Sequence, residues 1–397
     1  MFALWFDRRY IDFRWRLGRM PAPGREPHHG PGRLVEWSLL VGGLTLALAI
    51  PLGWGGSVAV TIVGFSGMAL TTFGLGYPTN AWGTFIGKPF VTVSPVGAAG
   101  QGAPANGGAD YGPDSNGTLT SGIQEAIGSG AASVVLLAKQ TLDTSTLQYV
   151  QTPFGTSTPI QLPSNRSLAL VSAGPQDRTP TGSAVIQYSG TSGYAIDTNT
   201  TNGSGNVRGY MDGLVVSTMS SGVHFNQVIY NIGTLEVYGS GAAGSIGVNF
   251  DYLSAPYMAH IHFLRVGVFG QNHVRINQDH WTCDHLETAF AYSTETSVVE
   301  KDAGWGTHIG YWHHFCSNQA PARHLYINTA NSKALFIGVY MQESSSYTNA
   351  TSYDIDNSVS GAEPLLFGQA DLVTGTLTIT GPTMRFDTTL NAWTTTL

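Results

Sequence analysis

Gly222–Asn226 (GVHFN), Gly247–Asp251 (GVNFD) and His273–Asn277 (HVRIN) are copies of one five-residue pattern, opened by Gly or His and closed by Asp or Asn. Looser copies and one degenerate copy extend the series: Gly193–Asp197, His324–Asn328, Ser352–Asp356 and the degenerate Ser297–Lys301. The copies start at positions 193, 222, 247, 273, 297, 324 and 352. A repeat of roughly 20–50 residues predicts a stacked array, because no single unit can bury its apolar face alone.

The array is predicted to be all-β. Each copy alternates inward apolar and outward polar residues, as does a strand with one buried face. About 25 residues per copy suffice for three short strands and three turns, and stacking such coils ~4.8 Å apart gives a parallel β-helix. We expect the closing acids and amides to stack at equivalent corners as structural turn residues: Asp197, Asn226, Asp251, Asn277, Asn328 and Asp356.

Charge is sparse and unevenly distributed. Charged residues make up 11% of the 397-residue chain, which has a net charge of −7 and four lysines, so no basic face for nucleic acid is expected. Seven arginines lie within residues 1–36, and no charged residue occurs from Trp37 to Gly87. The sequence therefore predicts five parts: an Arg-rich tail (1–36), a hydrophobic transmembrane segment (37–78), a Gly/Ala/Pro-rich linker (79–108), a parallel β-helix domain (109–370) and a C-terminal cap or tail (371–397).

The hydrophobic segment predicts membrane embedding by helical structure. It contains two apolar stretches, Trp37–Ile50 and Ser57–Tyr77, and a span needs about 20 such residues. Either a helical hairpin or one span with a shorter interfacial segment fits. An Arg-rich N-terminus favours the cytoplasmic side of the membrane. One span would then place the β-helix outside the cell, and a hairpin would return it to the cytoplasm. The Lys-poor, Thr/Ser-rich repeats favour an extracellular or virion-surface location.

Four motifs precede the repeats: Ala109–Thr118 (ADYGPDSNGT), Ser121–Ile127 (SGIQEAI), Ala132–Leu137 (ASVVLL) and Ile160–Asn165 (IQLPSN). Their order resembles the start of the pectate-lyase-like superfamily, which includes polygalacturonases, pectin and pectate lyases and phage tailspike depolymerases. The resemblance spans roughly residues 109–356 and implies a single-stranded, right-handed parallel β-helix. The catalytic signatures of the pectin-degrading branches are absent, since the sequence has no Asn-Thr-Asp, Asp-Asp, Gly-His-Gly or Arg-Ile-Lys.

The second of these motifs reads as a short amphipathic helix. Ile123, Ala126 and Ile127 share one face. This helix is expected to cover the open apolar end of the first coil, which an array needs in order to stay soluble.

A candidate site follows from the second strand of each repeat, aligned on the inward residues Leu235, Ile261, Leu286, Ile309 and Ile337. This alignment brings six side chains to one exposed face: Glu236, His260, His262, His285, Glu287 and His308. Glu236 and Glu287 would lie two coils apart, ~10 Å, which suits the acid/base pair of an inverting glycosidase. Three aromatic residues are predicted to stack on sugar rings: Tyr238, Trp312 and Tyr340.

The predicted catalytic residues are thus Glu236, Glu287, His262 and His285, and the predicted substrate-binding residues are His260, His308, Tyr238, Trp312 and Tyr340. A solvated or merely binding face explains the same residues, since outward β-helix positions are polar by default. The spacing of His260, His262 and His285 is only weak evidence for a zinc site. No metal or cofactor is expected. A second group of acids lies on expected turns and flanking strands: Asp212, Asp279, Asp284, Asp302 and Glu343.

Two functions remain open at this stage. The first is a membrane-anchored surface protein that binds polysaccharide and cleaves it as a glycosidase or lyase. The second is a non-catalytic surface or virion spike or adhesin, whose β-helix is a rigid rod that binds glycans or a partner. The C-terminal segment is expected to finish the array or cover its edge, and an uncovered edge would leave room for a homo-oligomer. A disulfide between Cys283 and Cys316 stays open as well.

Overall fold

The computed structural model describes residues 90–96, 109–113, 115, 118–143, 145, 148–173, 183–198, 208–252, 259–291, 295–315, 321–330, 335–343, 353–372, 377–387 and 392–395. The Arg-rich tail and the predicted transmembrane segment (37–78) lie outside these residues, so membrane embedding stays a prediction. Within the described ranges, no helix is long and apolar enough to cross a bilayer.

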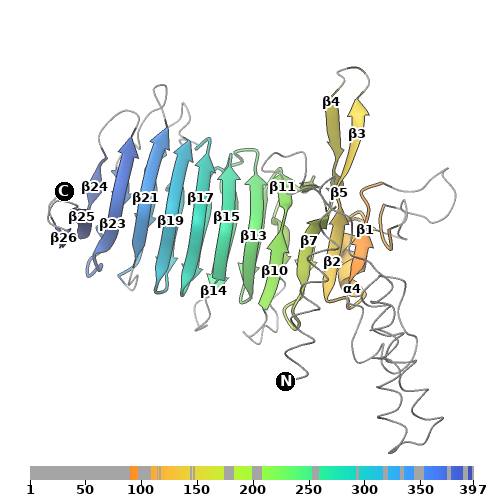
Figure 1. Cartoon of the computed structure of the whole chain (residues 1–397), viewed down its shortest axis with the longest axis horizontal. Helices are drawn as coiled ribbons and strands as arrows, with labels where there is room; N and C mark the ends of the chain where they lie inside the picture. Colours follow the sequence, from red (N-terminus) through yellow and green to blue (C-terminus); the bar gives the residue numbers. More distant parts are fainter. Residues whose placement is uncertain are drawn as a thin grey trace, which may run out of the picture. The chain divides into compact units, whose positions relative to one another are not determined.

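Nearly all described strands belong to two parallel sheets (Figure 1). The larger sheet runs β1 (Val91–Val93), β2 (Ser133–Leu137), β7 (Ala169–Ala173), β10 (Arg208–Asp212), β13 (Ile229–Tyr238), β15 (Ala259–Gly267), β17 (Trp281–Ala289), β19 (Thr307–Phe315), β21 (Phe336–Glu343), β23 (Leu365–Leu372), β25 (Thr383–Asp387) and β26 (Ala392–Thr394), joined by β5 (Phe154–Thr156), β8 (Ala184–Tyr188) and β11 (Leu214–Thr218). The smaller sheet runs β6 (Ile160–Leu162), β9 (Tyr194–Thr198), β12 (Ser221–Asn226), β14 (Ile246–Tyr252), β16 (Asn272–Gln278), β18 (Val299–Ala303), β20 (Arg323–Ile327), β22 (Tyr353–Asp356) and β24 (Ile379–Thr380). An antiparallel hairpin of β3 (Lys139–Asp143) and β4 (Gln148–Thr152) projects away from both sheets (Figure 1).

From β12 onward the chain alternates between the sheets, and each strand pairs in parallel with the strand one turn later. This all-β arrangement is consistent with the predicted parallel β-helix. We call one turn of the chain, with its strand in each sheet, a coil. β1 pairs with β2 and so belongs to the larger sheet. β1 (Val91–Val93) lies within the segment 79–108 that the sequence predicts to be a Gly/Ala/Pro-rich linker.

The number of strands per coil changes along the array. β10 and β11 are separate strands joined at Gly213, whose φ of 68° is in the left-handed region that glycine adopts without steric cost. β13 pairs with β10 over its first half and with β11 over its second half. The predicted three strands per coil thus hold for the early coils, and from β13 onward two of them fuse into one long strand.

A row of glycines occupies the middle of the later long strands. A Cβ on Gly310 would lie 2.8 Å from the carbonyl oxygen of Asp284, one on Gly338 would lie 2.5 Å from that of Gly310, and one on Gly368 would lie 2.2 Å from that of Gly338. Each glycine therefore lets its backbone approach the preceding coil more closely than any other residue could.

Gly338→Ala is expected to lower the free energy of unfolding by about 1–3 kcal/mol, because the new methyl must push one coil away from the next. Gly155→Ala is the matched control, since a Cβ on this strand residue would meet nothing within 4 Å. Urea denaturation followed by tryptophan fluorescence measures both changes. Equal costs for the two variants would show that the close approach is not what requires glycine at 338.

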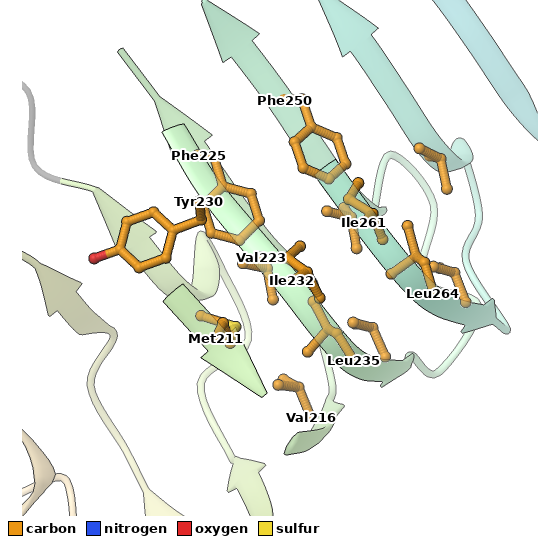
Figure 2. Packing of buried hydrophobic residues seen from close by; sticks show 14 of the residues in the cluster. Met211, Val216, Val223, Phe225, Tyr230, Ile232, Leu235, Phe250, Ile261 and Leu264 are labelled. Atoms are coloured by element: carbon orange, nitrogen blue, oxygen red, sulfur yellow. The ribbon is translucent and has the colours of Figure 1, made fainter. Parts of the chain in front are cut away.

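The core lies between the sheets and is built from inward columns of apolar residues (Figure 2). Phe225 and Phe250, from successive strands of the smaller sheet, stack with ring centroids 5.2 Å apart, and Tyr230 stacks on Phe225 at 5.3 Å. Burial of such a continuous column supplies the main stabilisation that each coil lacks alone.

Both ends of the array carry extra structure. Helix α4 (Ile123–Gly128) buries Ile123, Ala126 and Ile127 and packs against β1, β2 and β6, near the end of each sheet. The predicted covering helix is confirmed. At the other end, β24 and β25 continue the two sheets, and β26 pairs antiparallel with β25.

The predicted corner ladder is confirmed only in its centre. Asn226 lies opposite Asp251, and Asp251 opposite Asn277. The degenerate copy, Ser297–Lys301, overlaps β18, which lies between β16 and β20 and so contributes one coil to the array. For the outer copies the predicted alignment is wrong by two residues, because Asp197 lies opposite His224 and Asp356 lies opposite Tyr326. A register shift after Ile276 puts Ala303 opposite Asn277 and interrupts the ladder before Asn328.

The two errors in the outer copies have one cause. Register follows the inward apolar residues, and Ile196 pairs with Val223 rather than with Phe225, the residue that the pattern aligned with it. A slip of two keeps every side chain on its predicted face, so the alternation in the sequence cannot reveal it.

Candidate functional site

The two predicted catalytic glutamates lie in one outward row of the larger sheet. Glu236 on β13 lies opposite Arg265 on β15, and Arg265 lies opposite Glu287 on β17. The guanidinium contacts both carboxylates: Nη1 is 3.5 Å from Glu236 Oε2, and Nε donates to Glu287 Oε2 at 2.5 Å. The residue between the two glutamates is therefore an arginine, which is not among the predicted site residues. We call these three residues the carboxylate–arginine ladder.

The carboxylates of the ladder are well buried and hydrogen-bonded. Glu236 is 3% exposed and accepts from the hydroxyl of Tyr238 at 2.6 Å. Glu287 is 8% exposed, and its Oε1 lies 3.1 Å from His285 Nε2. Burial opposes the ionisation of Glu287, but His285 and Arg265 together hold its pKa below the ordinary value. This glutamate is ionised at neutral pH and poorly suited to donate a proton as a general acid.

A second cluster lies nearby, at the middle of β15 and β17. Asp284 binds two histidines of the neighbouring coil: Oδ1 is 3.0 Å from His260 Nε2, and Oδ2 is 3.1 Å from His262 Nδ1. The side chains are 57% (His260), 74% (His262) and 43% (Asp284) exposed. Hydrogen bonding to His260 contributes most to a lowered pKa of Asp284. The polar groups of this cluster are therefore accessible to solvent.

Half-buried rings line the same surface. Phe263, His285 and Tyr311 form a row across three coils, with centroids 5.1 and 4.7 Å apart. His308 stacks on Phe336 at 4.8 Å with an interplanar angle of 13°. Together with the Asp284 cluster these rings form the surface that we call the outer face: His260, His262, Phe263, Asp284, His285, His308, Tyr311 and Phe336, on β15, β17, β19 and β21.

Two predicted sugar-stacking residues are not on this face. Trp312 and Tyr340 are fully buried and pack against each other at 5.0 Å, so their prediction as substrate-binding residues is wrong. Tyr238 is half-buried and commits its hydroxyl to Glu236. Two aromatic rings that do lie on the outer face, Phe263 and Tyr311, were not predicted.

The error lies in the assumption of strict alternation along the long strands. Ile261 lies opposite Cys283, and Leu264 opposite Leu286, so the predicted alignment mixed two inward rows that are three residues apart. The strand changes phase at His262 and Phe263, where two consecutive side chains are not buried. The sequence of β15 contains a sign of this change. Its buried apolar residues change from odd positions (259 and 261) to even positions (264 and 266) at that point.

A buried polar cluster inside the coils was also missed. His273 and Glu295 are buried and lie 2.6 Å apart, from Nδ1 to Oε1. His324 Nδ1 lies 3.1 Å from Asp354 Oδ1 and 2.8 Å from the hydroxyl of Tyr340. These groups are shielded from solvent, and no set of three or more His, Cys, Asp or Glu in the described ranges is arranged to hold a metal ion.

Two acids of the second group occupy structural positions. Asp279 accepts from the backbone N–H of Trp305 at 2.7 Å, and Asp302 pairs with Arg275. Cys283 is a buried free thiol, whereas Cys316 lies outside the described residues. Burial raises the pKa of the Cys283 thiol and makes it unreactive.

Comparison of the chain with protein-family models, with curated proteins and with solved structures finds no match in any of the three, so the resemblance to the pectate-lyase-like superfamily rests on the motifs alone.

Proposed function

We propose that this chain is a surface-displayed, right-handed parallel β-helix of the pectate-lyase-like kind that binds polysaccharide on its outer face. The observation that carries the proposal is the exposed Asp284 cluster beside the row of Phe263, His285 and Tyr311. Sugar recognition needs this combination, because planar polar groups bond the hydroxyls while ring faces pack on the apolar C–H faces.

Binding is better supported than cleavage. An inverting glycosidase needs one carboxyl held protonated and one ionised. Glu236 and Glu287 instead share one guanidinium, and the pKa of Glu287 is lowered. Both carboxylates are also almost completely buried, which leaves little room for a scissile bond between them. The rod-like, non-catalytic alternative is therefore the one we adopt.

The location is part of the proposal and rests on sequence. The uncharged stretch from Trp37 to Gly87 supports an anchor in a lipid membrane, and the composition of the repeats supports display on a cell or virion surface.

Asp284→Asn is expected to weaken polysaccharide binding about 10-fold or more, because a charge-assisted hydrogen bond contributes about 1.5–3 kcal/mol. The full-length chain in mild detergent would be tested on immobilised neutral and acidic polysaccharides. Asp251→Asn is the matched control, since Asp251 is 41% exposed against 43% for Asp284 and also lies beside a histidine, on the other sheet. Absence of binding to every polysaccharide, or an equal loss in both variants, would refute the proposal.

A further inference from the structure

The larger sheet is depleted of positive charge across all the coils that build the outer face. The strands β13, β15, β17, β19, β21 and β23 contain a single Arg or Lys residue, Arg265. The same strands contain five acids: Glu236, Asp284, Glu287, Glu343 and Asp371. The charge of these six strands at neutral pH is therefore negative, apart from what their histidines contribute.

That single cation is already committed. Arg265 contacts both glutamates of the carboxylate–arginine ladder and lies over the ring of Phe263, with 5.7 Å from Cζ to the ring centroid. A carboxylate or sulfate of a bound glycan would have to compete for it with two buried glutamates that it already neutralises. Lys301, on the smaller sheet, is 1% exposed and turned into the core.

The groups that remain for a ligand suit hydroxyls. Asp284 bonds one nitrogen of each histidine, and the other nitrogens are His260 Nδ1 and His262 Nε2, on side chains that are more than half exposed. A neutral imidazole nitrogen can donate to or accept from a hydroxyl. The ring row runs from coil to coil, across the strands, so a linear chain of sugars would lie along the array.

We infer that the outer face selects uncharged polysaccharides and rejects polyuronates and sulfated glycans. The inference rests on the proposed function and specifies its ligand class. A neutral chain meets hydroxyl partners and ring faces without electrostatic cost. An anionic chain meets Asp284, and the strands that build the outer face hold no Arg or Lys other than the paired Arg265 to offset the repulsion. Salt screens this cost.

The test compares polysaccharides that share a backbone and differ in charge. Affinities of the full-length chain are measured for dextran against dextran sulfate, hydroxyethyl cellulose against carboxymethyl cellulose, and methyl-esterified pectin against polygalacturonate. We expect each neutral form that binds to do so at least 10-fold more tightly than its anionic counterpart. The difference should shrink in 0.5 M salt, because the Debye length shortens from about 8 Å at 0.15 M ionic strength to about 4 Å.

A variant that adds charge tests the cause. Thr282 lies between His260 and His308 in one outward row. Thr282→Lys is expected to raise affinity for the anionic forms about 10-fold and to leave the neutral forms within about threefold, as expected for one added Coulombic partner. Thr282→Gln controls for side-chain size and should leave the preference for neutral forms unchanged.

The outcomes separate the two proposals. Equal or tighter binding of the anionic forms, or no gain for them in Thr282→Lys, overturns the neutral-ligand inference while polysaccharide binding itself stands. Failure to bind any form, neutral or anionic, overturns the proposed function.

Discussion

Lys301→Met is expected to make the protein more stable at pH 7, by about 1–3 kcal/mol. Lys301 is 1% exposed, lies between Ile276 and Ile327 in neighbouring coils, and faces a small apolar cavity. Burial lowers its pKa to about 7, against attraction from Asp279 and Asp302. Methionine has similar length and no charge to desolvate. The gain is reduced by loss of the 2.8 Å hydrogen bond from Nζ to the Gln278 carbonyl oxygen, an unmade bond that costs about 1–3 kcal/mol.

The gain should depend on pH in a defined direction. The unfolded lysine titrates near its ordinary pKa of 10.5, and the folded one at about 7. Between these values the unfolded chain binds the extra proton, so wild-type stability rises with pH, at about 1.4 kcal/mol per pH unit. Wild type should thus gain about 2 kcal/mol from pH 7 to pH 9 relative to the variant, which lacks the titrating group.

Urea denaturation of the full-length chain in mild detergent, at pH 7 and pH 9, measures this difference. Lys301→Arg is the contrasting control, because an arginine stays charged at both values and is expected to destabilise at each. If wild type and Lys301→Met gained the same stability between pH 7 and pH 9, Lys301 would not be a buried titrating lysine.

Lys301 also shows what the sequence could and could not predict. Its segment, Ser297–Lys301, was recognised as a degenerate copy from spacing alone, and β18 is where that copy was expected. The inward direction of its lysine was not foreseen, because the copy puts Lys301 at the closing, outward position, whereas in the structure it lies opposite the inward residues Ile276 and Ile327. Periodicity thus identified the coil, while the chemistry inside the coil depended on three-dimensional neighbours.

For the candidate site too, the sequence predicted the strands that carry the residues but not the contacts between them. The sequence placed His260, His262 and Glu287 on adjacent strands of one sheet, and they are there. It did not pair Asp284 with the histidines, because that contact joins two coils at a place where the long strand changes phase. Contacts between coils depend on register, and the register of a repeat with variable loops is not fixed by its spacing.

The carboxylate–arginine ladder gives the second large effect. Arg265→Met is expected to lower the free energy of unfolding by about 2–4 kcal/mol. It leaves Glu236 and Glu287, which are 3% and 8% exposed, without their shared cation. Removing one partner of a buried ion pair costs about 3–5 kcal/mol. We expect somewhat less here, because the arginine side chain is 29% exposed and solvent screens part of the interaction.

The cost should be reversed by removing the charges that the arginine neutralised. Combining Arg265→Met with Glu236→Gln and Glu287→Gln is expected to restore stability to within about 1 kcal/mol of wild type, because an uncharged buried row needs no cation. Arg323→Met is the matched control. That arginine is 28% exposed and serves one carboxylate, Asp356, which keeps its hydrogen bonds to Ser358, so its loss should cost about half as much.

The triple variant also decides between scaffold and catalyst. If the ladder is structural, the variant should fold and keep its affinity for polysaccharide, because the Asp284 cluster is untouched. If the glutamates perform acid/base chemistry, wild type should release sugar from a polysaccharide and the triple variant should lose that activity while keeping its stability. A triple variant no more stable than Arg265→Met alone would contradict the ladder itself, since it would show that the two buried carboxylates did not need Arg265.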